Sequence, residues 1–250
     1  MSNNKLSRRR FLKTGGLAAV SVTLLRETVW SRQSREMTLY IGTYTQNTSS
    51  EGIYTYRMNS DTGELKKFSS IMSVNPSFVA LDRRRRFLYA VNEVQEFEGK
   101  PGGAVSAYAI EPDGKLKFLN QQASAGGDPC HLTVDRGRRN LLVANYTGGN
   151  LALLPVRRDG TLGPVADLEQ HEGSGPKEQQ KGPHTHCIIL DSSERHALAA
   201  DLGIDKVMIY RFDKTGKLRP AKQPSEPLQA GAGPRHLTLH PNGRFPYVIN

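Results

Sequence analysis

The stretch PCHLTVDRGRRNLLVANY, from Pro129 to Tyr146, contains two apolar runs separated by a polar turn. Three other segments also begin with proline and have the same design: PSFVALDRRRRFLYAVNE from Pro76, PHTHCIILDSSERHALAADLG from Pro183 and PRHLTLHPNGRFPYVIN from Pro234. The four prolines are 53, 54 and 51 residues apart. A fixed period of about 50 residues is the mark of a repeat architecture.

Each repeat continues with two further runs joined by a turn that contains glycine. These turns are DTGEL, PDGKL, RDGTL and KTGKL, with Gly63, Gly114, Gly160 and Gly216. Glycine adopts positive φ without strain, so such sequences favour tight hairpins. Four short antiparallel strands per repeat describe a propeller blade, whereas a parallel β-helix needs a shorter period and a helical solenoid needs 3.6-residue periodicity.

The sequence therefore predicts an all-β fold, a β-propeller of four-stranded antiparallel blades over residues 37–250. We expect repeats to start near residues 37, 76, 129, 183 and 234, so that four to five blades are represented. The segment LYIGTYT, from Leu39 to Thr45, matches LVANYTG of a later repeat and indicates a first repeat without its opening strand.

Net charge and cysteine content exclude several classes of protein. The formal net charge is +10, but residues 1–36 contribute +6 of it and the remaining body only +4. Basic residues do not alternate with aromatic ones on one face, so we expect no nucleic acid partner. The chain has 2 cysteines, which fit neither a disulfide scaffold nor a paired zinc site and are predicted to be small buried side chains.

The N-terminal segment resembles a twin-arginine export signal. Ser7 to Lys13 reads SRRRFLK, and Gly15 to Leu25 supplies a short apolar region. Eleven helical residues rise only about 16 Å, too little for a hydrocarbon core of about 30 Å, so no stable membrane span is expected. Residues 1–36 are predicted to be a signal peptide and linker recognised by the twin-arginine machinery, which places the protein in the periplasm or elsewhere outside the cytoplasm. The alternative is a cytoplasmic chain with a basic start.

Two segments carry a resemblance to a known family. GPHTHCIILD followed by ADLGIDKVMIYRFD, and GAGPRHLTLHPNGRFPYVIN, resemble the lactonase family of seven-bladed β-propellers. This family includes propeller-type bacterial 6-phosphogluconolactonases and fungal carboxy-muconate lactonizing enzymes. The resemblance runs from about Thr38 to Asn250. It implies seven blades, and seven repeats of this period need roughly 330 residues, so we expect a C-terminally truncated chain that is poorly soluble or associates.

Five polar side chains are predicted to border the central channel, because the first strand of a propeller blade lines it. They follow the prolines of the repeats and are His131, His184, His186, Arg235 and His236. Lactone hydrolysis needs a base that activates water and cations for an anionic substrate. Histidine suits the first task and the planar guanidinium of arginine the second.

The resemblance places the catalytic histidine of the family on His184 and its substrate-binding arginine on Arg235. It places an acidic partner one position beyond Asn250, and Asn92-Glu93 of an earlier repeat indicates the type of residue expected there. We expect His186, His131 and His236 to bind substrate. The alternative for His131 and His236 is a structural role, since both occupy the same position of the repeat.

The implied function is hydrolysis of an anionic sugar lactone, as in a 6-phosphogluconolactonase, without metal or cofactor. Muconate-type lactonizing activity and a non-catalytic binding propeller remain alternatives. A metal held by His184 and His186 is less favoured, because no carboxylate accompanies them in that strand. The loop from His171 to Gly182 is interpreted as a solvated connection.

Overall fold

A computed structural model describes residues 36–213 and 215–250 of the chain. The predicted export signal lies outside the described residues, apart from residue 36. Within the described part, strands dominate and the one helix is the short 3-10 turn η1 (Glu178–Gln180). That part contains no helix with the length and apolar character needed to cross a bilayer. The prediction of an all-β fold is confirmed.

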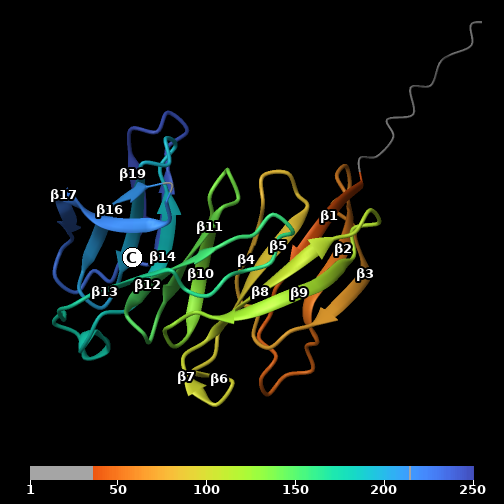
Figure 1. Ribbon diagram of the computed structural model, residues 1–250, viewed down its shortest axis with the longest axis horizontal. Coiled ribbons are helices and arrows are strands. Elements are labelled where there is room, and N and C mark those ends of the chain that lie inside the picture. Colours follow the sequence, from red (N-terminus) through yellow and green to blue (C-terminus); the bar gives the residue numbers. More distant parts are fainter. Residues whose placement is uncertain (1–35, 214) are drawn as a thin grey trace, which may run out of the picture. The chain divides into compact units, whose positions relative to one another are not determined.

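Antiparallel sheets follow one another along the chain (Figure 1). The first has three strands, β1 (Glu36–Ile41), β2 (Gly52–Asn59) and β3 (Leu65–Met72). The second has four strands, β4 (Val79–Leu81), β5 (Phe87–Asn92), β8 (Ala104–Ile110) and β9 (Leu116–Ala123), with a small hairpin of β6 (Glu96–Phe97) and β7 (Lys100–Pro101) beside it.

Two more four-stranded sheets and one hairpin complete the described chain. The third sheet consists of β10 (Pro129–Val134), β11 (Asn140–Asn145), β12 (Asn150–Pro155) and β13 (Asp167–Gln170). The fourth consists of β14 (Thr185–Leu190), β15 (His196–Asp201), β16 (Lys206–Asp213) and β17 (Lys217–Pro227). The hairpin pairs β18 (His236–Leu239) with β19 (Pro246–Ile249). These four-stranded sheets are the blades expected from the repeat.

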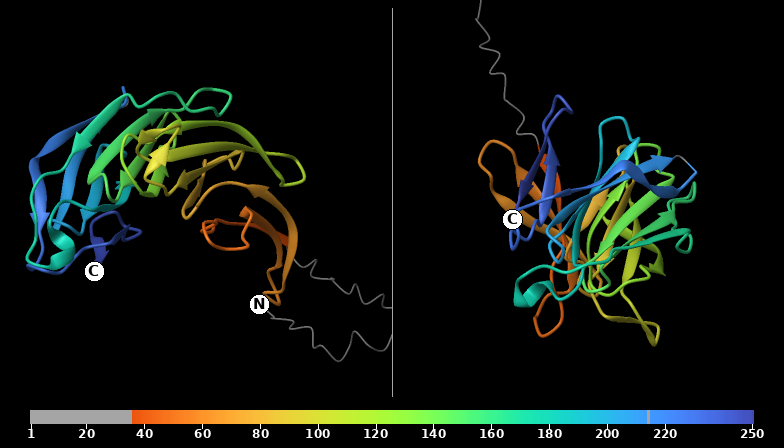
Figure 2. Two further views of the ribbon diagram at one scale, coloured as in Figure 1. Left: turned by 90° about the horizontal axis from the view of Figure 1, so that it is seen from below. Right: turned by 90° about the vertical axis from the view of Figure 1, so that its left-hand side faces the viewer.

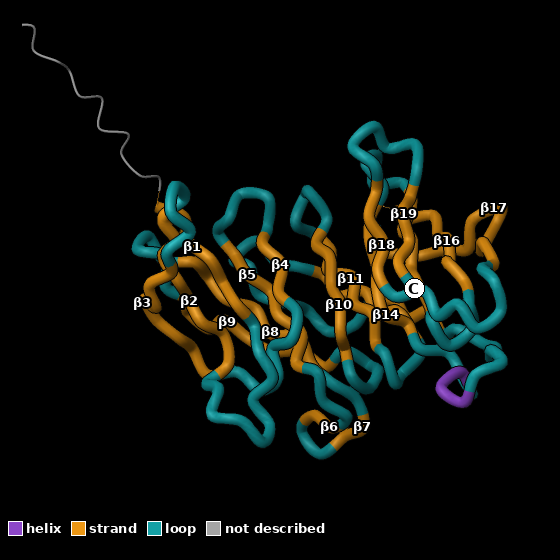
Figure 3. The backbone as a smooth tube through the Cα atoms, turned by 180° about the vertical axis from the view of Figure 1, so that it is seen from behind, coloured by secondary structure: helices purple, strands orange, loops and turns teal. Residues whose placement is uncertain are grey.

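Hydrophobic cores lie between neighbouring sheets rather than within one. Tyr89 of β5 and Leu132 of β10 belong to the cluster between the second and third sheets. Leu142 and Tyr210 belong to the cluster between the third and fourth. This face-to-face succession follows an arc, with the first strands of the sheets on its inner side (Figures 2 and 3). Neighbouring sheets therefore bring their first strands, β4, β10, β14 and β18, next to one another.

The predicted glycine turns are hairpin turns in which glycine is required by the backbone. Gly63, Gly114, Gly160 and Gly216 all have positive φ, between 74° and 92°. At Gly160 a Cβ atom would also lie only 2.1 Å from the ring of Phe87 in the preceding sheet. The turn chemistry read from the sequence thus fixes both the hairpin and its contact with the neighbouring sheet.

Candidate functional site

A bulge near the start of two first strands decides which side chains meet at the inner side of the arc. The register between β10 and β11 shifts around Cys130, and the register between β14 and β15 shifts around His186. A bulge leaves one residue without a cross-strand partner and re-aims its side chain. Cys130 and His186 therefore occupy the same position of their sheets.

The pairing with the second strands extends this comparison to the other sheets. His236 pairs with the residue before Asn250, as His131 pairs with the residue before Asn145. In the second sheet the carbonyl of Phe78 accepts the backbone N–H of Val91, the residue before Asn92. Two sets of residues follow: the bulge set Ser77, Cys130, His186 and Arg235, and the strand set Phe78, His131, Cys187 and His236.

The bulge set lines a cavity of about 480 Å³. Glu93, Tyr146 and Leu202 each directly follow the second strand of their sheet and also line the cavity, together with Tyr44 from the loop after β1. Phe78, Gln179, Gly233 and His236 contribute the remainder. The cavity is thus built by repetition, because the same two positions of each repeat supply its lining.

Arg235 and His186 form a direct pair in this cavity. A guanidinium nitrogen of Arg235 lies 2.6 Å from Nε2 of His186. Since a guanidinium only donates, Nε2 accepts and the imidazole proton sits on Nδ1. Burial, followed by the charge of Arg235, lowers the pKa of His186 to about 4. His186 is therefore neutral near pH 7 and holds the arginine at the cavity wall.

Among the residues that the structure describes, Glu93 is the one carboxylate in the wall of this cavity. Its Oε2 accepts a hydrogen bond from the hydroxyl of Tyr44 at 2.9 Å and another from the hydroxyl of Ser77. Burial and this contact with Glu93 raise the pKa of Tyr44 to about 12, so the phenol stays protonated and donates. From the sequence, Glu93 was recognisable only as an analogue of the acidic residue expected beyond Asn250, and Tyr44 was not identified.

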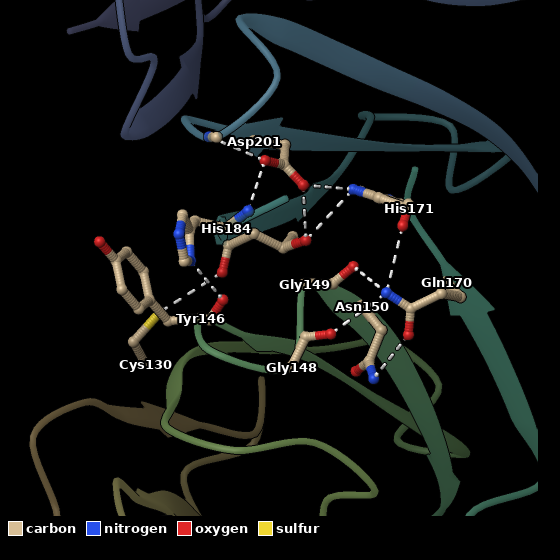
Figure 4. Close-up of polar contacts among 11 residues, drawn as sticks. Cys130, Tyr146, Gly148, Gly149, Asn150, Gln170, His171, His184 and Asp201 are labelled. Carbon is tan, nitrogen blue, oxygen red and sulfur yellow. Dashed lines mark hydrogen bonds and ion pairs between the residues drawn. The ribbon is translucent and has the colours of Figure 1, made fainter. Parts of the chain in front are cut away.

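His184 lies just before β14, and its ring stacks on Tyr146 of the cavity wall with a centroid distance of 4.6 Å (Figure 4). Nδ1 of His184 lies 3.2 Å from the carbonyl oxygen of Tyr146. Because a carbonyl can only accept, Nδ1 carries a proton, and Nε2 is the nitrogen that carries the lone pair in the neutral ring. Nε2 is therefore the atom of His184 that can act as a base.

A buried network fixes the backbone of His184. Asp201 Oδ1 accepts the backbone N–H of His184 at 2.7 Å. Asp201 Oδ2 lies 2.6 Å from Nδ1 of His171 and accepts the hydroxyl of Thr185 at 3.0 Å (Figure 4). The side chains of Asp201 and His171 are both fully buried. Asp201 therefore ties the end of β15 to the start of β14.

His131 and Cys187 lie behind the cavity wall, whereas His236 reaches the cavity. The ring of His131 packs against the tilted ring of Phe78 with a centroid distance of 4.1 Å, and its centroid lies 5.7 Å from that of His236. Burial, with smaller effects of the nearby histidines, lowers the pKa of His131 to about 3. Of the five side chains predicted to border the channel, His186, Arg235 and His236 line one cavity, His184 adjoins its wall and His131 lies beneath it.

The loop from residue 171 to 182 is anchored rather than simply solvated. Gln180 is buried and donates its side-chain amide to the carbonyl of Leu202 and to Asp205, both at 2.7 Å. Asp205 also accepts the backbone N–H of Gly233 at 2.8 Å. The loop therefore positions Gln179 at the cavity and braces the segment that precedes Arg235.

Comparisons with known proteins agree with this geometry. The sequence profile of the family described as "Lactonase, 7-bladed beta-propeller" matches residues 38–250. A 6-phosphogluconolactonase of Bacillus subtilis is 36% identical over 212 residues, which cover 84% of this chain and 58% of that protein. A second 6-phosphogluconolactonase, from Formosa agariphila, is 28% identical, with 85% of this chain and 61% of that protein covered.

Solved structures give the same picture. A putative 6-phosphogluconolactonase from Bacteroides fragilis superposes with a TM-score of 0.81 at 36% identity, covering 88% of this chain and 62% of that chain. The periplasmic gluconolactonase of Pseudomonas aeruginosa superposes with a TM-score of 0.81 at 33% identity, covering 86% and 61%. The chain thus spans about three-fifths of the length of the curated relatives it matches.

Proposed function

Since the chain belongs to the lactonase family of seven-bladed β-propellers, we propose that the protein hydrolyses a sugar lactone at the cavity formed by Arg235, His186 and Glu93. The observation that supports this proposal is the fixed tautomer of His184 beside a cavity wall that carries an arginine. In this proposal a base for water adjoins the cavity whose wall carries a cation for an anionic substrate.

In the proposed mechanism His184 acts as the base. Its Nε2 takes a proton from water while the water oxygen attacks the lactone carbonyl carbon. The bond between that carbon and the ring oxygen then breaks, and the imidazolium returns its proton to the ring oxygen. The products are a hydroxyl group and a carboxylic acid, which loses its proton to solvent near pH 7.

Arg235 binds the anionic group of the substrate in this proposal. One of its N–H groups is held by Nε2 of His186, which leaves the others free to form paired hydrogen bonds with phosphate or carboxylate. Neutral His186 orients the guanidinium without competing for the anion. The relatives described as 6-phosphogluconolactonases support a phosphorylated aldonolactone as the substrate.

We also propose export through the twin-arginine route, on the basis of the sequence SRRRFLK near the N-terminus. The relative from Pseudomonas aeruginosa that is described as periplasmic supports this location. Fractionation of cells that produce the native protein tests it. We expect the protein in the periplasmic fraction, and we expect a change of Arg8 and Arg9 to lysine to retain it in the cytoplasm. Equal distribution of both forms would argue against export.

The experiment that tests the activity uses the natural full-length protein and two substrates, glucono-δ-lactone and its 6-phosphate. We expect hydrolysis above the spontaneous rate, and a decrease of about 100-fold or more in kcat for His184→Ala. His240→Ala is the matched control, because His240 does not line the cavity. Absence of hydrolysis with both lactones would contradict the proposed activity, and hydrolysis unaffected by His184→Ala would contradict the proposed base.

A further inference from the structure

Three side chains that bind soft metal ions converge from three neighbouring sheets. They are His131 of β10, Cys187 of β14 and His236 of β18, and all belong to the strand set defined above. The ligand atoms they offer lie within 4.8 Å of one another. The repeat therefore brings two imidazoles and one thiol to the same level of the inner strands. None of these three side chains has a role in the proposed mechanism, which uses His184 and Arg235.

The distances fit a tetrahedral ion closely on one edge. Nε2 of His131 lies 3.6 Å from Sγ of Cys187. For a tetrahedral ion with bonds of about 2.05 Å to nitrogen and 2.3 Å to sulfur, that edge is about 3.6 Å. His236 completes the set by a movement of its side chain towards the other two ligands, and this side chain is exposed at the start of β18.

The protonation states of the two buried groups are compatible with a metal ligand role. Burial lowers the pKa of His131 to about 3, so its imidazole is neutral. Burial raises the pKa of Cys187 to about 11, so the free side chain is a thiol that releases a proton when a metal binds. Nδ1 of His131 accepts the N–H of Ile188 at 3.4 Å, and metal binding at Nε2 gives up this long contact because the imidazole proton moves to Nδ1.

We propose that His131 Nε2, Cys187 Sγ and an imidazole nitrogen of His236 bind one Zn²⁺ ion, with water in the fourth position. Two nitrogen ligands and one thiolate are a set that zinc favours over calcium or magnesium. The ion reaches the site through the cavity that His236 lines. The site is distinct from the pair His184 and His186 considered as ligands from the sequence.

Cobalt substitution tests this site without reference to lactone hydrolysis. Co²⁺ is added to the reduced full-length protein and its near-ultraviolet and visible absorption is recorded. We expect a thiolate-to-cobalt charge-transfer band that saturates at one ion per chain and is displaced by Zn²⁺. Cys187→Ser removes the charge-transfer band, and His236→Gln weakens Co²⁺ binding at least tenfold.

The other free cysteine gives a matched control. Cys130→Ser leaves the spectrum unchanged, because Cys130 belongs to the bulge set and its Sγ approaches the carbonyl oxygen of His186 instead. His236→Gln changes an exposed side chain, so it reports on binding even if Cys187→Ser does not fold. The proposal is overturned by a wild-type protein without the band, by a band that survives Cys187→Ser, or by Co²⁺ affinity that His236→Gln leaves unchanged.

Discussion

Replacing Asp201 by alanine is expected to destabilise the protein strongly, because four hydrogen bonds end on this buried carboxylate. Two come from the backbone N–H groups of His184 and Gly203, at 2.7 and 3.0 Å. The other two involve His171 at 2.6 Å and Thr185 at 3.0 Å. Removing one partner of such a buried, hydrogen-bonded group costs about 3–5 kcal/mol, because the remaining donors stay buried without partners.

Asp201→Asn is the matched comparison, since the equivalent positions of two other repeats carry Asn92 and Asn145. An asparagine keeps an oxygen for the two backbone N–H groups and loses the acceptor that faces His171. We therefore expect Asp201→Asn to cost about 1–3 kcal/mol and Asp201→Ala about 3–5 kcal/mol. For a domain of this size the alanine variant would melt about 6–20 °C below the wild type.

Urea unfolding followed by far-ultraviolet circular dichroism measures both variants. A free energy of unfolding for Asp201→Ala within about 1 kcal/mol of the wild type would refute the assigned network. Equal losses in the asparagine and alanine variants would also refute it, because the backbone contacts to Oδ1 would then carry no stability. A decrease in kcat without a change in stability would likewise contradict the reasoning, which ties the placement of His184 to this network.

Three further expectations follow from the same geometry. Burial lowers the pKa of His131 to about 3, so on acidification the unfolded chain binds a proton at this residue before the folded chain does, and stability falls as the pH decreases from about 6.5 towards 4. His131→Phe should reduce the slope of the unfolding free energy against pH by about one proton. An unchanged slope in urea unfolding at several pH values would contradict this expectation. A Cβ on Gly203 would lie 2.0 Å from the carbonyl oxygen of Gly182, whereas a Cβ on Gly182 meets nothing within 4 Å; we expect Gly203→Ala to lose about 2 kcal/mol and Gly182→Ala to stay near wild type. Arg235→Ala should lower kcat/KM about 10- to 150-fold for the phosphorylated lactone and much less for the neutral one, and equal losses would show that the arginine does not recognise the anion.

The fold was predictable because its signals are local and repeated. The glycine of each hairpin turn and the apolar runs on either side of it recur in every repeat, and the structure has the expected four-stranded antiparallel sheets. The register of the first strands was harder to predict from the sequence. Counting from the prolines groups His131 with Thr185, whereas the bulges at Cys130 and His186 place His131 level with Cys187.

The candidate site was predictable only in part, for a physical reason. Histidine and arginine attract attention by their chemistry, so Arg235 and His186 were identified from the sequence. Tyr44, Glu93 and Tyr146 come from segments after the second strands, and nothing in their local sequence indicates that three sheets bring them to one cavity. Comparing the residue directly after each second strand, repeat by repeat, could have found Glu93 and Tyr146.

Lactone hydrolysis by the full-length protein, measured at one pH with the wild type and His184→Ala, tests the central claim most directly. The account places the base at Nε2 of His184, so we expect kcat of His184→Ala to fall about 100-fold or more. His240→Ala should keep the wild-type kcat, because His240 does not line the cavity. A His184→Ala variant that retains the wild-type kcat would contradict the account.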